Sequence, residues 1–258
     1  MATAPFPSPT SKWHNKTYDS ISPTRPELSA KGKTIIITGG GTGIGAETAL
    51  YFAHAGASRI GLLGRREQPL LDTKASIHNK YPNVDIFVAS TDVTNKAQVD
   101  SAFSKFVGQG KIDILISNAA MIGPQDPVKS VDPNMFLDAV NLNLKGSLNV
   151  AQTFLHYAAT DAVVIDVNSS VAHINFGPGF TAYGVAKLAV FRLWDSLAFS
   201  NPQLSVFHLQ PGVVDTDMNK EAGGIDAVGF SDDGKYLAVT CQVQYRHPNL
   251  NSISPSKL

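Results

Sequence analysis

Short apolar runs alternate with segments of helical spacing between Lys33 and Thr216. The apolar runs are rich in β-branched residues, which is typical of strands buried on both faces of a sheet. Between them, apolar residues recur every three or four positions, as they do in a helix with one buried face. The pattern predicts strands over 34–38, 59–63, 84–88, 112–117, 162–167 and 204–209. It predicts helices from Ala46 to about Gly56, over 67–80, over 95–107, from an N-cap at Asp132 with Pro133 at N1 towards Tyr157, and over 181–199.

Six strands separated by helices indicate a parallel sheet that is covered on both faces. Right-handed crossovers make such a sheet doubly wound. We therefore predict an α/β fold of three αβα layers, the Rossmann fold, with no internal repeat or linker in its body. The expected divisions are a proline-rich arm over 1–31, a dinucleotide-binding domain over 32–229 and an irregular tail over 230–258.

The tail departs from the alternating pattern, because no seventh strand and helix follow Gly224. We therefore expect an incomplete or irregular C-terminus. One hypothesis is a gene-model fault: Gly234, Lys235 and Tyr236 can be encoded GGT-AAG-TAT, which contains a splice-donor string, so the residues that follow would be translated intron. If the tail is native instead, the sheet has a bare edge strand.

Composition narrows the functional classes. The chain has 21 basic and 21 acidic residues, which removes the electrostatic case for binding nucleic acid or an anionic membrane. No apolar run approaches the roughly 20 residues of a membrane helix, and the N-terminus has no apolar segment typical of a secretory signal. The one cysteine, Cys241, excludes an intrachain disulfide. We expect a cytoplasmic protein with no nucleic-acid or membrane partner, and we assign no metal ligand.

A glycine-rich turn follows the first predicted strand in the sequence TGGGTGIG, residues 38–45. Because glycine has no Cβ, the chain can turn tightly there, and its backbone can approach a pyrophosphate at the helix N-terminus. The position between a strand and a helix is the context that indicates dinucleotide binding. Gly39, Gly43 and Gly45 are therefore candidate cofactor-binding residues, and the alternative is a tight turn without a ligand.

The end of the second strand favours one cofactor. A free 2′-hydroxyl is bound by an acidic residue about 20 positions after the glycines, whereas a guanidinium suits a 2′-phosphate. Here Gly64 is followed by Arg65 and Arg66. The sequence therefore predicts NADP(H), with NAD(H) less favoured, and the alternative is two solvated arginines on a turn.

Tyr183 and Lys187 lie four residues apart, on one face of a predicted helix, and Ser170 precedes the tyrosine by thirteen residues. An ammonium group beside a phenol stabilises the phenolate, which suits proton exchange near neutral pH. Such a pair also arises by chance on helix surfaces. Further polar motifs follow the third, fourth and sixth strands, at the sheet edge where open α/β folds bind ligands: Asp92-Val93, Asn118-Ala119-Ala120 and PGVVDT over 211–216.

Together these motifs, with Asn143 in NLNLKG and with YGVAK, resemble the short-chain dehydrogenase/reductase family over Lys33 to Thr216. The resemblance implies that Tyr183 is the general acid/base and that Lys187 assists it and holds the nicotinamide ribose. It implies that Ser170, rather than its neighbour Ser169, binds the substrate oxygen, and that Asn143 supports a water and proton relay to Lys187.

The resemblance also implies that the glycine turn and the strand ends hold the cofactor. The implied residues are Gly39, Thr42, Gly43, Ile44, Gly45, Arg65, Arg66, Asp92, Val93, Asn118, Tyr183, Lys187, Pro211, Gly212, Val214 and Thr216. The arm and the sequence RPELSAKGKT before the first strand are similar to members from filamentous fungi, many of which serve secondary metabolism.

Two departures from the family matter. Ala120 replaces a glycine that the family usually has after the fourth strand. The family also continues past its PGxxxT motif into a covering helix and a last strand that commonly builds the subunit interface, and the sequence gives no sign of that strand. A homo-oligomer is therefore in doubt.

The leading hypothesis is an NADP(H)-dependent reductase or alcohol dehydrogenase that interconverts a carbonyl and a secondary alcohol. We expect the pocket to be shaped by residues 121–131, residues 173–180 and the region after Asp217. These segments are apolar and glycine-rich, which suits a small hydrophobic substrate. One alternative is a dinucleotide-binding protein without turnover, because its C-terminal lid and last strand are missing. Epimerase or dehydratase chemistry on the same scaffold is less favoured at this chain length.

Overall fold

The computed structural model describes residues 19–175, 177 and 179–223. Six strands form one parallel sheet in the order β3-β2-β1-β4-β5-β6, as the sequence predicts for a doubly wound fold. The strands are β1 (Thr34–Thr38), β2 (Arg59–Gly64), β3 (Asp85–Ser90), β4 (Ile112–Ser117), β5 (Ala158–Val167) and β6 (Ser205–Leu209). The α-helices are α1 (Gly43–His54), α2 (Glu67–Lys80), α3 (Lys96–Val107), α4 (Pro133–Tyr157), α5 (Thr181–Ser200) and α6 (Asp217–Glu221).

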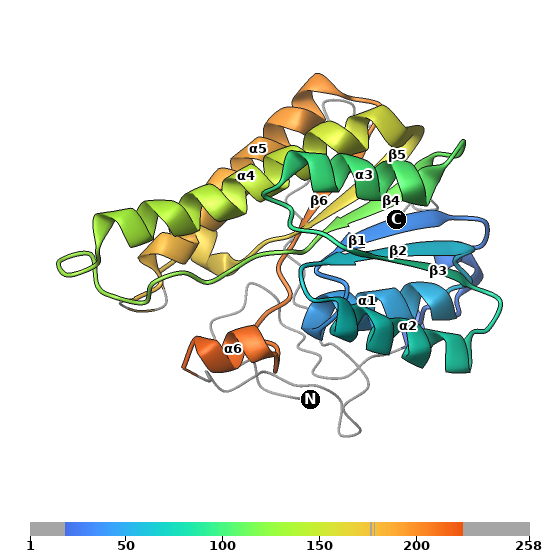
Figure 1. Cartoon of the computed structure of the whole chain (residues 1–258), viewed down its shortest axis with the longest axis horizontal. Helices are drawn as coiled ribbons and strands as arrows, with labels where there is room; N and C mark the ends of the chain where they lie inside the picture. The colour runs from blue at the N-terminus through green and yellow to red at the C-terminus, as the bar shows by residue number, and fades with distance from the viewer. Residues whose placement is uncertain (1–18, 176, 178, 224–258) are drawn as a thin grey trace.

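The helices cover both faces of the sheet. Helices α1 and α2 lie on one face, and α3, α4 and α5 lie on the other (Figure 1). Each strand sends alternate side chains into the two layers, so that Ile36 packs among α3, α4 and α5 while Ile35 and Ile37 pack towards α1 and α2. The sheet order reverses between β1 and β4, which opens a crevice at the carboxyl ends of these strands.

Two predicted helix starts are confirmed by their caps. The Asp132 carboxylate accepts hydrogen bonds from the amides of Asn134 and Met135, and Pro133 occupies the first helical position of α4. At the start of α3, the Asn95 side chain accepts a hydrogen bond from the Gln98 amide. These caps satisfy amides that have no partner within the helix.

Two element starts differ most from the predicted ones, and β3 runs over Asp85–Ser90 rather than 84–88. Helix α1 begins at Gly43 rather than Ala46, because the last glycines of the turn already form its first turn. Strand β5 begins at Ala158 rather than Ala162, directly after α4. Its early residues Thr160 and Asp161 are exposed and polar, so the hydrophobic pattern does not reveal them. The pairing of β4 with β5 shifts register at this point, between Ile112 and Ile114.

The described end of the predicted arm packs on the domain. It forms two short 3-10 helices, η1 (Asp19–Ile21) and η2 (Pro26–Leu28). Ala30 is buried in the α1 layer, and Lys31 forms an isolated antiparallel bridge with Ala57. The tail over 230–258, with Cys241 and the proposed splice site at Gly234, lies outside the described residues.

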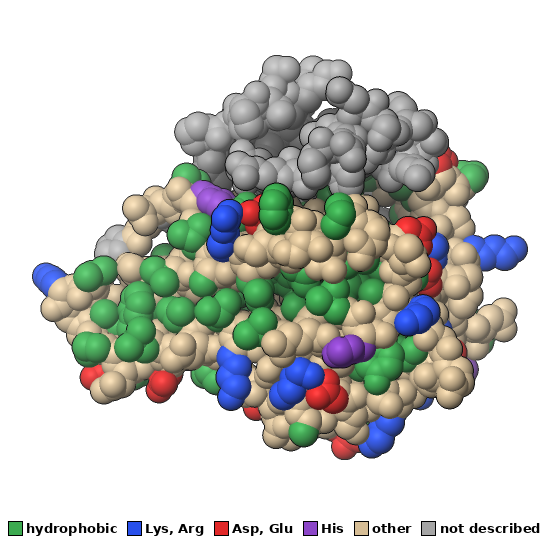
Figure 2. Space-filling model, turned by 90° about the horizontal axis from the view of Figure 1, so that it is seen from above, with side chains coloured by type: hydrophobic (Ala, Val, Ile, Leu, Met, Phe, Trp, Pro, Cys, Tyr) green, Lys and Arg blue, Asp and Glu red, His purple; other side chains and the backbone are tan. Residues whose placement is uncertain are grey.

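Helices α4 and α5 expose large hydrophobic side chains, including Leu137, Leu148, Val185 and Leu188. Figure 2 looks onto this side of the molecule and shows hydrophobic side chains gathered on it. Contact with a second copy would cover such a face. Within the described chain, β6 pairs only with β5, and no helix is long and apolar enough to cross a bilayer.

Candidate functional site

A cavity of about 850 Å³ opens at the carboxyl ends of the strands, a size that suits a small-molecule ligand. It is lined by residues from every motif that the sequence singled out. The predicted site residues on its wall are Gly39, Thr42, Gly43, Ile44, Arg65, Arg66, Asp92, Val93, Asn118, Asn143, Ser170, Tyr183, Lys187, Pro211, Gly212, Val214 and Thr216.

Gly45 is the predicted site residue that is not on this wall, and it packs closely against the end of β1. A Cβ built on Gly45 would lie 2.1 Å from the carbonyl oxygen of Gly39. Only glycine therefore allows α1 to approach the end of β1 this closely. Cofactor binding by Gly45 stays a prediction.

The N-terminus of α1 faces the cavity and suits a phosphate group. Its N-cap, Thr42, makes no side-chain capping hydrogen bond, so the amides of the first turn are not satisfied by that side chain. Gly43 has a φ of 51°, in the left-handed region that favours glycine. Unsatisfied amides and the positive end of the helix dipole both attract an anion, so this turn fits a pyrophosphate.

Asn118 ties the end of β4 to the glycine turn. Its Nδ2 donates to the carbonyl oxygens of Thr38 and Gly39, at 3.0 and 3.2 Å. Its backbone amide donates to the Thr38 hydroxyl at 2.9 Å. Because the side-chain amide is committed to the backbone, Asn118 fixes the shape of the cavity wall at the point where β1 and β4 diverge.

The ends of β2 and β3 supply charge at the cavity edge. Arg65 and Arg66 are both exposed, and neither guanidinium forms an ion pair with a described residue. Asp92 accepts hydrogen bonds from the backbone amide and the hydroxyl of Thr94. These bonds, the amide first, lower the pKa of the Asp92 carboxyl, and the charges of Arg65 and Lys145 act in the same direction.

Tyr183 and Lys187 lie on the cavity wall, on successive turns of α5. Lys187 is 5% exposed, and its Nζ donates to the Val167 carbonyl oxygen at 2.7 Å. The same Nζ lies 5.7 Å from the centre of the Tyr183 ring. The predicted pairing of an ammonium with a phenol on one helix face is therefore present.

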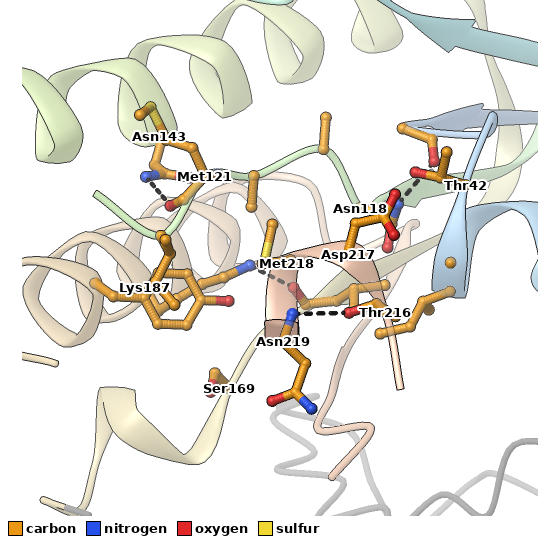
Figure 3. A pocket seen from close by; sticks show the side chains of 18 of the residues that line it. Thr42, Asn118, Met121, Asn143, Ser169, Lys187, Thr216, Asp217, Met218 and Asn219 are labelled. Carbon is orange, nitrogen blue, oxygen red and sulfur yellow. Dashed lines mark hydrogen bonds between the residues drawn. The ribbon is translucent and has the colours of Figure 1, made fainter. Parts of the chain in front are cut away.

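Asn143 on α4 holds the loop after β4 (Figure 3). Its Oδ1 accepts from the Met121 amide, and its Nδ2 donates to the carbonyl oxygens of Met121 and Ala139, at 2.8 to 3.0 Å. Both N–H groups of the side chain are thus used within the protein. These contacts position Met121 on the cavity wall, and the proton relay through Asn143 stays a prediction.

Two serines lie at the start of the 3-10 helix η3 (Ser170–Ala172), and both line the cavity. The Ser170 carbonyl oxygen accepts hydrogen bonds from the amides of His173 and Ile174. The Ser169 amide donates to the Asn168 side chain at 2.8 Å. Neither serine hydroxyl is hydrogen-bonded to a described residue, so either could bind a ligand oxygen, and the choice of Ser170 stays a prediction.

A short helix, α6, follows Thr216 and lines part of the cavity. The Thr216 hydroxyl caps α6 by accepting from the Asn219 amide at 3.1 Å (Figure 3). Met218, Asn219 and Glu221 line the cavity, and the Gln125 side chain donates to the Glu221 carbonyl oxygen. Thr216 followed by Asp217 is an N-cap signal that the sequence reading missed.

Sequence reasoning also missed three buried polar residues behind Lys187. They are Asp166, Asn168 and His208, on β5, just after it and on β6. Their signal was available, because a carboxylate or an imidazole inside an apolar strand needs a partner.

Comparison with known proteins gives consistent matches. Residues 33–224 match the protein family described as short chain dehydrogenase. A short chain dehydrogenase/reductase of Claviceps purpurea is 29% identical over 82% of this chain and 72% of its own. Short chain dehydrogenase pigC of Monascus ruber is 30% identical over 89% of this chain and 76% of its own. The crystal structure of levodione reductase aligns with a TM-score of 0.69 and 26% identity, over 74% of this chain and 76% of that chain.

Proposed function

This chain belongs to the short-chain dehydrogenase family, and from that premise we propose that it is an NADP(H)-dependent oxidoreductase that interconverts a carbonyl and a secondary alcohol. The observation that carries the proposal is the position of Tyr183 and Lys187 on the wall of the cavity that also contains the glycine turn. A proton donor and a dinucleotide site on one cavity are the two parts that such a reaction requires.

The proposed roles follow from these positions. A bound nicotinamide supplies the hydride for reduction and accepts it in oxidation. Tyr183 gives its phenolic proton to the carbonyl oxygen as the alcohol forms, and takes that proton back in the reverse direction. The Lys187 ammonium stabilises the phenolate left behind, since an adjacent positive charge favours that form. The Ser170 hydroxyl donates a hydrogen bond to the reacting oxygen.

The choice of NADP(H) is supported by the end of β2. Arg65 and Arg66 are exposed at the cavity edge and form no ion pair with a described residue. No acidic residue stands between Gly64 and Arg66 to bind a 2′-hydroxyl. Two guanidinium groups suit the charge and geometry of a 2′-phosphate.

A hydrophobic substrate is supported by the cavity wall around Tyr183. The side chains there are largely apolar: Met121, Ile122, Leu142, Val171, Ile174, Phe180 and Met218. Apolar walls with few polar groups favour a ligand with one reacting oxygen on a hydrocarbon frame. The similarity to filamentous-fungal proteins supports a place in secondary metabolism.

The test is a spectrophotometric assay of NADPH and NADH oxidation with a panel of hydrophobic ketones and aldehydes, and of the reverse reaction with the matching alcohols. The proposal predicts turnover with at least one ketone and faster turnover with NADPH than with NADH at equal concentration. Tight cofactor binding with no turnover on the whole panel would support the alternative of a dinucleotide-binding protein.

A further inference from the structure

A buried polar cluster joins β5, β6 and α5 behind the proposed proton donor. Asp166 and His208 are register partners on the two strands, and the Asp166 Oδ2 lies 2.9 Å from the His208 Nδ1. Asp166 is 1% exposed and His208 is 7% exposed. An ionised carboxylate only accepts hydrogen bonds, so the Nδ1 carries the shared proton when Asp166 is ionised.

Asn168 connects this pair to the site. Its Nδ2 donates to the same Asp166 Oδ2 at 2.7 Å and to the Lys187 carbonyl oxygen at 3.2 Å. Its Oδ1 accepts from the Ser169 amide at 2.8 Å. Asn168 itself is buried. The side-chain amide of Asn168 therefore holds two backbone groups in place, the Ser169 amide and the Lys187 carbonyl of α5.

Lys187 is held at both ends by the last residue of β5 and the residue after it. Its side-chain Nζ bonds to the carbonyl oxygen of Val167, between Asp166 and Asn168, while its backbone carbonyl bonds to Asn168. A rotation of the Asn168 side chain would release the Lys187 carbonyl and the Ser169 amide together. Asp166 prevents that rotation only while its carboxylate keeps its own position, which His208 fixes from β6.

Contacts between aromatic rings reinforce this arrangement. The Phe191 ring of α5 lies 4.1 Å from the His208 ring, measured between ring centres, and 5.0 Å from the His173 ring, which follows η3. The His208 ring thus makes two separate contacts, a hydrogen bond to Asp166 and a packing contact to Phe191. These two contacts can be removed one at a time.

We propose that His208 and Asp166 are positioning residues that, through Asn168, hold Lys187 and the Ser169–Ser170 segment in the geometry for proton transfer. They touch neither substrate nor cofactor in this role, and the role rests on the proposed function. Displacement of a reacting group by about 1 Å costs on the order of a hundredfold in rate, so loosening this cluster should lower kcat.

The test compares two substitutions of His208, one that removes the ring and one that removes the hydrogen-bond donor. His208→Asn keeps a donor near the position of Nδ1 and loses the ring, whereas His208→Phe keeps the ring against Phe191 and loses the donor. We expect His208→Phe to lower kcat about tenfold to a hundredfold, with the KM for NADPH within about twofold of the native value. We expect His208→Asn to recover most of the lost kcat.

Thr153→Val is the structural control. Thr153, on α4, is also buried, and its hydroxyl bonds to Asp100 and to the Asn149 carbonyl oxygen, away from the cavity. We expect this variant to lose stability in urea denaturation and to keep the native kcat. If kcat falls in step with the free energy of unfolding in all three variants, the positioning role is overturned.

A second readout does not depend on turnover. Hydrogen–deuterium exchange followed by mass spectrometry reports the protection of residues 167–174 and 183–191 in each variant. The inference predicts faster exchange in both segments for His208→Phe, and near-native exchange for His208→Asn and Thr153→Val. Unchanged exchange in His208→Phe would overturn the positioning role, whether or not the native protein turns over a substrate. An absence of turnover in the native protein would instead count against the proposed function.

Discussion

The Nζ of Lys187 lies 2.7 Å from the Val167 carbonyl oxygen, so the lysine of α5 is attached to the end of β5. This bond places the ammonium 5.7 Å from the centre of the Tyr183 ring, on the cavity side of the helix. A protonated amine has three N–H donors, and Val167 uses one of them. Within the described residues the other two form no hydrogen bond, so they can serve a ligand in the cavity.

Replacing Lys187 with methionine keeps the length of the side chain and removes its charge and its donors. We expect Lys187→Met to lower kcat by about a hundredfold or more, because the Tyr183 phenolate loses its stabilising charge. Steady-state kinetics with NADPH and the best ketone measure this loss. Lys74→Met is the control, since Lys74 is exposed on α2 and does not line the cavity. Equal losses in the two variants would contradict the assigned role.

Gly43 lies so close to Thr216 that a single and a double variant should differ in cofactor affinity. A Cβ on Gly43 would lie 2.8 Å from the Thr216 Cγ2, at a φ of 51° that L-residues adopt at a cost of about 1–2 kcal/mol. We expect Gly43→Ala to weaken NADPH binding at least tenfold, measured by cofactor fluorescence titration. Adding Thr216→Ser removes the clashing methyl and keeps the capping hydroxyl, so the double variant should recover part of the affinity. No recovery would place the whole effect in the backbone strain.

Arg65 and Arg66 should decide between the two nicotinamide cofactors. A hydrogen bond to a charged group contributes about 1.5–3 kcal/mol, so losing such contacts to a 2′-phosphate costs at least about tenfold in affinity. We expect the double variant Arg65→Ala, Arg66→Ala to raise the KM for NADPH by that factor and to leave the KM for NADH nearly unchanged. NADH is the internal control, and a parallel rise for both cofactors would argue against a 2′-phosphate site.

Asp92 should make stability depend on acid pH. The Thr94 amide, followed by its hydroxyl, holds the pKa of the Asp92 carboxyl below its ordinary value. The folded pKa is therefore lower than the unfolded value of about 4, so the carboxylate stabilises the fold above that pH, and this contribution is lost as the pH falls through the folded pKa. Asp92→Asn keeps an acceptor for Thr94 and does not titrate. Urea denaturation at about pH 6 and about pH 3.5 should show a smaller loss of unfolding free energy in the variant.

Much of the fold and site follows from local sequence signals. The β-branched run Thr34–Thr38, the glycines after it and the caps Asn95 and Asp132 each determine structure within a few residues. Tyr183 and Lys187 share a face because they are one helical turn apart. The doubly wound order then brings the strand-end motifs to one cavity, since parallel strands end on one edge of the sheet.

The remaining features depend on contacts between distant segments. Nothing near Gly45 indicates that its hydrogen faces the Gly39 carbonyl oxygen, because that approach is set by the packing of α1 on β1. The family resemblance predicts a relay role for Asn143. Its hydrogen bonds to Met121 could not be predicted, because they depend on how α4 crosses the loop after β4. The pairing of Asp166 with His208 depends on the register of β5 with β6, which no local pattern fixes.

The most direct test of the central claim is the hydride-transfer rate of Tyr183→Phe, measured by single-turnover stopped flow with bound NADPH and the best ketone. The substitution removes one oxygen and keeps the ring beside Lys187, so cofactor affinity should stay within about threefold of the native value. We predict a fall in the transfer rate of about a hundredfold or more, the loss expected when a general acid is removed. A native rate in Tyr183→Phe would contradict the assignment of Tyr183 as the proton donor.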